Sequence, residues 1–200
     1  MQQLFTRDLL TTFPTHSFTP ISLKATPLYI YEVKDLNELG HSIKFTVMTD
    51  IEPDERSFKV HNVIVENPIT HICIDGDFIP FGQEKYDLKS DKFKDGRPDC
   101  LIFEQERLLL VELKLDQESE TEKSKWNNFF KGVTQIEDFV TFLRNNHFEV
   151  TAYFPRVSAV ICMRFEPVFR SNTARNTEKY KRSIQLGIEL IASNFVEFTR

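Results

Sequence analysis

Residues 98–115 read PDCLIFEQERLLLVELKL, and this stretch decides the fold. It holds two apolar runs, 98–103 and 107–115, separated by the polar pair Gln105-Glu106. Runs of this length and composition, bounded by polar turn residues, predict two strands joined by a hairpin. Because side chains alternate between the two faces of a strand, every second residue of each run lies on one face of the sheet.

The register of this hairpin brings charged residues together. With the turn centred between Gln105 and Glu106, Asp99 lies directly opposite Glu112, at a Cβ separation of roughly 4.5 to 5.5 Å. Lys114, two residues beyond Glu112, shares the face of both carboxylates. Most other positions of the second run are leucine or valine, so we expect a hairpin buried on both faces with its charges clustered at one end.

The segments after the hairpin alternate helix and strand. Ser119-x-x-Glu122 has the spacing of a capping box, and apolar residues then recur every three or four positions, which predicts a helix over 122–146. An apolar run predicts a strand over 156–163, and a second helical spacing predicts a helix within 177–198. This order of strand, strand, helix, strand and helix predicts an α/β (α+β) sheet with helices packed on its faces.

The first part of the chain reads mostly as strands. Stretches 22–33, 43–48 and 58–65 are rich in β-branched and aromatic residues and are bounded by Pro, Asp, Asn or Gly. Segment 71–81 predicts a further hairpin, because its Asp-Gly pair favours a tight primed turn. A short helix is expected over 1–10. The sequence therefore predicts a β-rich N-terminal elaboration of the sheet.

Length and composition predict one domain. The chain has 200 residues and a mass of 23.5 kDa, which lies within the roughly 50 to 250 residues of single domains. Hydrophobic residues make up 40% and charged residues 28%, which excludes a disordered chain. We expect a single domain over 1–200, with the β-rich part over 1–69, a core over 70–165 and a C-terminal helix over 166–200.

The sequence also indicates a cellular compartment. No apolar run approaches the roughly 18 residues that a membrane helix requires, and the N-terminus lacks a basic segment followed by an apolar one. We therefore expect a cytoplasmic protein with no membrane partner. Cys73, Cys100 and Cys162 are widely spaced within apolar runs, which favours reduced core thiols over a disulfide framework or a zinc site.

The charges are unevenly distributed. The net charge of −5 argues against a protein that coats nucleic acid over its whole surface. Stretch 156–182 is nevertheless net basic, and 82–97 reads as an exposed loop in which lysines alternate with acids. Both stretches could contact phosphates, and both fit a solvated surface equally well. Their basic residues are Lys85, Lys89, Lys92, Lys94, Arg97, Arg156, Arg164, Arg170, Arg175, Lys179, Lys181 and Arg182.

Asp99 and Glu112 need compensation, because opposed carboxylates repel each other. Lys114 can offset part of the repulsion, and Mg²⁺ or Mn²⁺ bound by carboxylate oxygens would offset more while leaving room for waters and a phosphate oxygen. A lysine beside such a metal can orient or deprotonate an attacking water and stabilise charge on a phosphate. In a plainer interpretation, Glu112 and Lys114 form an ordinary ion pair and Asp99 ends a turn.

A Pro-Asp pair at 98–99, twelve intervening residues and a Glu-Leu-Lys triplet at 112–114 resemble the motif of the PD-(D/E)xK nuclease superfamily. The resemblance implies a restriction-endonuclease-like fold, in which a central mixed sheet is flanked by helices. It implies that Asp99 and Glu112 bind the metal together with the carbonyl of Leu113. It further implies that Lys114 serves the water and the phosphate.

The resemblance also implies a positioning amide on the following helix, and Gln135 is the matching residue. At 100° per residue, Gln135 projects between Phe139 and Phe142 inside the apolar arc, so it should face the interior. A buried amide needs hydrogen-bond partners, which either the metal site or the neighbouring backbone could supply.

The resemblance covers about residues 70–165, and the chain departs from it before that core. Many superfamily members carry a further acid on a helix before the hairpin, whereas residues 13–81 read as strands. Glu84, Asp77 and Glu66 are candidates for this acid, and each also fits a plain surface carboxylate.

The resemblance implies a Mg²⁺-dependent deoxyribonuclease, a hydrolase of phosphodiester bonds whose partner is DNA; the same apparatus would serve RNA. Cleavage of both strands would call for two sites, in a homodimer or with a partner protein. The alternative is a non-catalytic nucleic-acid- or protein-binding module of the same fold, acting as a subunit of a defence, repair or mobile-element complex. In a third interpretation the β-rich half carries an interaction function and the hairpin charges are incidental.

Overall fold

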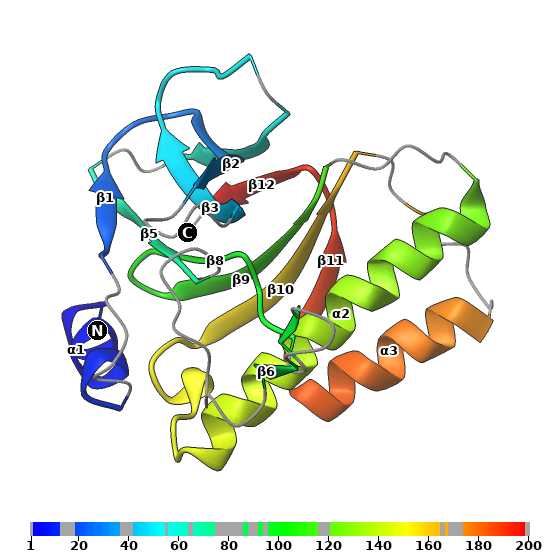
Figure 1. Ribbon diagram of the computed structural model, residues 1–200. Helices are drawn as coiled ribbons and strands as arrows, with labels where there is room; N and C mark the ends of the chain where they lie inside the picture. The colour runs from blue at the N-terminus through cyan, green and yellow to red at the C-terminus, as the bar shows by residue number, and fades with distance from the viewer. Residues whose placement is uncertain are drawn as a thin grey trace.

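The computed structural model describes residues 2–12, 19–36, 42–54, 56–63, 66–74, 86–87, 92–93, 96–115, 121–164, 167 and 174–198. In these segments the chain is mixed α/β. Helices pack on one face of a large mixed sheet, and a smaller mixed sheet packs on its other face (Figure 1). The helices are α1 (Gln2–Thr12), α2 (Glu122–Asn145) and α3 (Ala174–Leu186), with a 3₁₀ turn over Val150–Ala152. The strands are β1 (Ile21–Leu23), β2 (Leu28–Leu36), β3 (Ser42–Thr49), β4 (Phe58–Asn62), β5 (Ile69–Cys73), β6 (Tyr86–Asp87), β7 (Lys92–Phe93), β8 (Cys100–Phe103), β9 (Arg107–Lys114), β10 (Arg156–Met163), β11 (Glu189–Ala192) and β12 (Phe195–Phe198).

The large sheet has six strands in the order β1-β5-β8-β9-β10-β11. The pairs β1–β5, β5–β8 and β8–β9 are antiparallel, whereas β9, β10 and β11 run parallel. The β8–β9 hairpin pairs Cys100 with Val111 and Phe103 with Leu108, which is the register that the sequence predicts. The bounds of β10 likewise equal those predicted for a strand.

The small sheet, ordered β12-β4-β2-β3, buries the back of the hairpin. Phe58 and Phe198 of this sheet lie in one apolar core with Leu109 and Val111 of β9, and all four side chains are at most 1% exposed. Cys100 and Cys162 lie in the same core as reduced thiols. The expectation that β9 is buried on both faces is confirmed, because the helices cover its other face.

Helix α2 covers the front of the large sheet. Trp126, Phe129 and Ile136 share a second apolar core with Leu108 and Leu110 of β9. The side-chain oxygen of the N-cap residue, at position 121, accepts the backbone N–H of residue 124 at 3.3 Å and so satisfies one donor of the first turn. The predicted helix is confirmed to within one residue at its end, but the cap expected at position 119 is wrong, because the N-cap lies at position 121. Among the described helices, none is long and apolar enough to cross a lipid bilayer.

The predicted C-terminal helix is wrong beyond Leu186. Helix α3 ends there, Gly187 follows with φ 66°, and β11 and β12 then join the large and small sheets. Glycine adopts this left-handed conformation without steric cost, so it ends the helix. Tyr180 and Ile184, two of the apolar residues whose helical spacing predicts this helix, are 69% and 64% exposed. The segment 166–200 is therefore a helix followed by two strands in its described part.

Most N-terminal elements form where the sequence places them, including α1 and β3. The predicted strand 22–33 is two strands, β1 and β2, separated around Pro27, which has no N–H for a ladder. The predicted strand 58–65 starts at the same residue as β4, but β4 ends earlier, at Asn62. Segment 71–81 starts within β5, and its expected Asp-Gly turn lies outside the described residues.

His71 of β5 is a buried ionisable residue, 1% exposed, between the two sheets. Its Nε2 lies 3.0 Å from Oγ1 of Thr46 on β3. Burial lowers the pKa of His71 to about 4 from an ordinary value near 6.5, so the folded protein holds the imidazole neutral. A group whose pKa falls on folding contributes stability above the unfolded pKa and loses it as the pH falls through the folded pKa.

We expect the free energy of unfolding to fall as the pH drops from about 6.5 to about 4, with about 3 kcal/mol of that fall due to His71. Urea unfolding at several pH values would measure it. In His71→Gln the fall should be smaller by that amount, whereas His147→Gln, an exposed site, should follow the wild type. Equal pH profiles for wild type and His71→Gln would contradict the prediction.

Candidate functional site

Asp99, Glu112 and Lys114 converge at the carboxyl end of β9. Asp99 directly precedes β8, and the other two residues lie on β9. Continuing the hairpin register by one pair sets the two carboxylates opposite each other, on the face whose Leu101–Leu110 pair lies in the helix-side core. Asp99 is 8% exposed and Glu112 is 1% exposed. The predicted placement of these three side chains is therefore confirmed, in a nearly buried setting.

The charged groups of the site contact one another and the backbone. Nζ of Lys114 donates hydrogen bonds to Oε1 of Glu112 and, at 2.9 Å, to Oε1 of Gln135. The backbone N–H of Leu113 donates to Oδ2 of Asp99. Lys114 therefore contacts the Glu112 carboxylate and the Gln135 amide, whereas the backbone of β9 contacts Asp99.

The backbone of Leu113 faces the Asp99 side of β9. Its N–H reaches Oδ2 of Asp99, and in an extended strand the N–H and C=O of one residue point to the same side. The Leu113 carbonyl is therefore directed past the start of β8, toward the side on which Asp99 lies. This orientation is the one required of the carbonyl that the resemblance assigns to a metal.

Gln135 lies on the face of α2 that approaches the hairpin, and it is half-buried. Its Oε1 accepts from Lys114, and its Nε2 donates to the carbonyl of Arg97 at 3.4 Å. The amide thus has a side-chain partner at its accepting end and a backbone partner at its donating end. Gln135 thus links Lys114 to the backbone that leads into Asp99.

Gly96 and Asp138 belong to the same arrangement, and the sequence reading missed both. The N–H of Gly96 donates to Oδ2 of Asp138 at 3.0 Å. A Cβ added at Gly96 would lie 2.4 Å from Cα of Gln135, so the chain approaches the helix backbone as closely as glycine permits. The end of the predicted exposed loop 82–97 is therefore packed on α2, which positions the backbone before Asp99. A usable signal was the spacing of Asp138 three residues after Gln135, on the same helix face.

Gly132 lets α2 approach β9 and β10 closely. A Cβ added at this position would lie 2.9 Å from Cγ2 of Ile161 and 3.2 Å from Cγ of Glu112. The helix therefore packs directly against the Glu112 side chain, and a larger residue at position 132 would displace that side chain.

Of the three candidates for a further acid, Glu66 lies among the described residues. Glu84 and Asp77 lie outside the described residues. Glu66 is exposed, and its neighbour Asn67 accepts a hydrogen bond at 3.2 Å from Gln105 in the β8–β9 turn. This turn lies at the opposite end of the hairpin from Asp99, so the suggestion of Glu66 as a site residue is wrong.

The donor atoms of the site suit a hard cation. In the described segments no group of three or more His, Cys, Asp or Glu residues could enclose a metal ion. Asp99 and Glu112 nevertheless offer carboxylate oxygens on one face, with the Leu113 carbonyl directed to the same side. Mg²⁺ is commonly held by one or two carboxylates while waters and substrate phosphates complete its octahedron. The residues present therefore fit Mg²⁺ or Mn²⁺ bound in this open manner.

No protein-family model, curated protein or solved structure matches the chain.

Replacing Gly132 by valine should destabilise the fold by about 1–3 kcal/mol, because branched carbons would overlap Ile161 and Glu112. Urea unfolding would measure the loss. Lys131→Val introduces the same side chain at the adjacent exposed position of α2, and it should cost less than about 1 kcal/mol. Similar losses for the two variants would contradict the close approach described for Gly132.

Adding Mg²⁺ or Mn²⁺ should raise the melting temperature of the wild type, because binding at ten times Kd contributes about 1.4 kcal/mol. Asp99→Asn and Glu112→Gln should each abolish the shift, since each removes a negative charge from the site. Differential scanning fluorimetry with and without EDTA would measure it. Glu66→Gln removes an equal charge at the opposite end of the hairpin and should respond like the wild type. An undiminished shift in Asp99→Asn would place the metal elsewhere.

Proposed function

We propose that the chain is a metal-dependent nuclease of the PD-(D/E)xK type that hydrolyses phosphodiester bonds, with DNA as its substrate. The observation that carries the proposal is the convergence of Asp99, Glu112 and Lys114 on one face of the β8–β9 hairpin. Helix α2 adds Gln135, whose amide contacts the Lys114 ammonium. The hairpin and the following helix thus supply the three motif side chains and the amide that the family often adds.

The order of the elements supports the same proposal. An antiparallel hairpin, β8–β9, is followed by α2 and then by β10, which returns parallel to β9 in the same mixed sheet. This order is similar to the one that the resemblance implies for a restriction-endonuclease-like core.

The carboxylates of Asp99 and Glu112, with the Leu113 carbonyl, would hold the metal ion. When bound, Mg²⁺ or Mn²⁺ supplies a polarised water and neutralises charge that develops on the phosphate. The hydrogen bond from the Leu113 N–H keeps the Asp99 carboxylate turned toward β9. The buried position of Glu112 keeps bulk water from competing with its ligand.

In the proposed reaction, the Lys114 ammonium contacts the phosphate and the attacking water. Its side chain is 19% exposed, so its ammonium can reach a phosphate oxygen or an attacking water at the open end of the site. Gln135 orients that ammonium through the 2.9 Å hydrogen bond. In the overall step, a water oxygen bonds to phosphorus and one phosphorus–oxygen ester bond breaks, which yields a phosphate monoester and a hydroxyl.

We expect purified protein to cleave plasmid or single-stranded DNA with Mg²⁺ or Mn²⁺ and to be inactive in EDTA. Lys114→Met and Asp99→Asn should each lower the rate by about 10²-fold or more, because each removes a group that acts on the reacting phosphate. Agarose and denaturing gels would follow cleavage. Lys24→Met, at an exposed site on the far side of the large sheet, should keep wild-type activity.

Inactivity of the wild type on DNA and RNA with either metal would contradict the nuclease proposal. Metal-dependent stabilisation without cleavage would then favour the non-catalytic module. Cleavage of both strands of a duplex by a homodimer would appear as a second-order dependence on protein concentration. A cytoplasmic location remains part of the proposal.

A further inference from the structure

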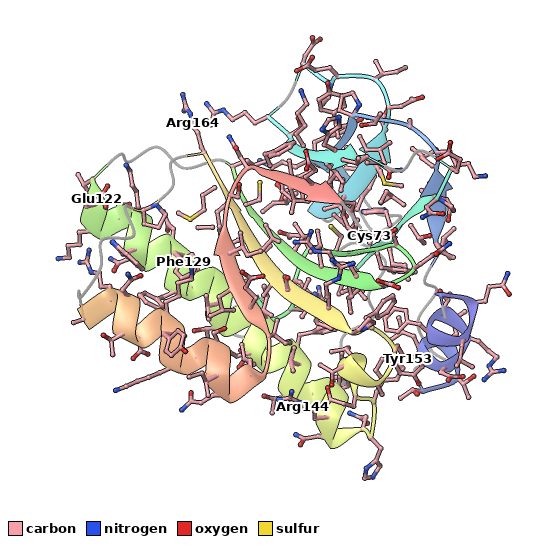
Figure 2. The ribbon with its side chains drawn as sticks, turned by 180° about the vertical axis from the view of Figure 1, so that it is seen from behind. Cys73, Glu122, Phe129, Arg144, Tyr153 and Arg164 are labelled. Atoms are coloured by element: carbon pink, nitrogen blue, oxygen red, sulfur yellow. The ribbon has the colours of Figure 1, made fainter. Side chains whose placement is uncertain are left out.

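Arginines that are distant in sequence lie at one edge of the large sheet. Strands β9 and β10 run parallel with Lys114 paired to Met163, so the residues that follow, Leu115 and Arg164, lie level at the same edge. Neighbouring strands are about 5 Å apart, which places exposed Arg164 close to the end of the site strand. Figure 2 labels Arg164 at the end of β10, on the side of the molecule where α2 begins at Glu122.

Arg56 reaches this edge from the N-terminal half. It lies between β3 and β4 of the small sheet, and its Nη1 donates to the carbonyl of Leu115 at 3.0 Å. Leu115 is the residue directly after Lys114. The loop that carries Arg56 therefore packs against the end of the site strand, with an exposed guanidinium beside it.

Arg175 lies on the same side of the molecule. Its guanidinium carbon is 5.8 Å from the centre of the Trp126 ring, near the start of α2. Farther along the two helices, Arg182 contacts Glu137. Because the first contact joins the starts of both helices and the second joins later turns, α3 runs parallel to α2 and begins beside the start of α2. Arg175 is exposed.

Arg156 and Arg182, two other basic residues of the stretch 156–182, lie away from this edge. Arg156 lies at the far end of β10, level with Arg107, and pairs with Glu106 at 3.3 Å. Arg182 bonds Glu178 and Glu137 between the helices, and burial lowers the pKa of Lys179. The stretch is therefore not one continuous basic surface, and Arg170 lies outside the described residues.

We propose that Arg56, Arg164 and Arg175, the arginine edge, bind phosphates of a DNA backbone and lead it into the site at Lys114. Guanidinium groups suit this role because their planar N–H donors match phosphate oxygens in pairs. Ligands of open α/β sheets also bind outside the carboxyl ends of the parallel strands, which is where the three arginines lie relative to Lys114. The choice of DNA rests on the proposed nuclease function, whereas the binding surface can be tested without cleavage. The inference gives the N-terminal half a direct part in substrate binding, through Arg56.

The test is the salt dependence of DNA binding, measured by fluorescence anisotropy with a labelled duplex and the full chain. EDTA is present throughout, because it prevents cleavage and removes divalent ions that compete for phosphates. The edge variant carries Arg56→Gln, Arg164→Gln and Arg175→Gln. The control variant carries Arg7→Gln, Lys24→Gln and Arg156→Gln, which are exposed residues away from this edge and make an equal change in net charge. Circular dichroism checks that each variant is folded.

We expect the edge variant to bind about tenfold or more weakly than wild type at low salt, with a slope of log K against log[NaCl] shallower by about 2 to 3. The single Arg56→Gln variant should flatten the slope by about 1. The control variant should lose much less affinity. This pattern supports the arginine edge even if no cleavage is found.

Three results would overturn the inference. The edge variant could bind with wild-type affinity and slope, the control variant could lose as much affinity as the edge variant, or the wild type could fail to bind DNA at the lowest salt. The cleavage assay judges the nuclease proposal separately. An edge variant that still cleaves and binds like wild type would remove this inference and leave the nuclease in place.

Discussion

The structure depends on holding two carboxylates opposite each other at the buried end of a hairpin. Two unit charges about 5 Å apart, in a medium of effective dielectric constant about 20, repel by roughly 3 kcal/mol. The protein offsets this with the Lys114 ammonium on Glu112 and the Leu113 N–H on Asp99. The proposed function gives this arrangement a reason, because a metal ion bound by both carboxylates would offset their repulsion further.

The rest of the fold keeps the carboxylates from moving apart. The small sheet and the helices bury both faces of β9, so the backbone that carries Glu112 and Lys114 has little freedom. Two glycines allow α2 to pack closely on the hairpin. Gly132 lets α2 contact Glu112, and Gly96 lets the chain before Asp99 contact the same helix. Helix α2 is therefore hydrogen-bonded to both parts of the site. Gln135 accepts from Lys114 of β9, and Asp138 accepts from the backbone before β8.

Local patterns predicted much of this arrangement. The β8–β9 register follows from a short polar turn and strict alternation, which act over a few residues, so Asp99 could be placed opposite Glu112 without a structure. The length of α2 followed from its apolar period. The same kind of reasoning failed for 177–198, where Tyr180 and Ile184 continue a helical spacing although they are exposed. The left-handed Gly187 was the overlooked signal, since it ends the helix and starts the strands.

The sequence by itself determined which residues carry charge, which segments become strands or helices, and how the two strands of one hairpin face each other, because these properties depend on neighbours in the chain. The tertiary structure decided how far α2 approaches the hairpin, what Gln135 and Asp138 contact, and that Arg56 meets Leu115, a residue 59 positions away. Contacts of this kind join segments whose separation is set by the packing of two apolar cores. No local pattern encodes that packing, so the positions of the site's supporting residues emerged only from the folded chain.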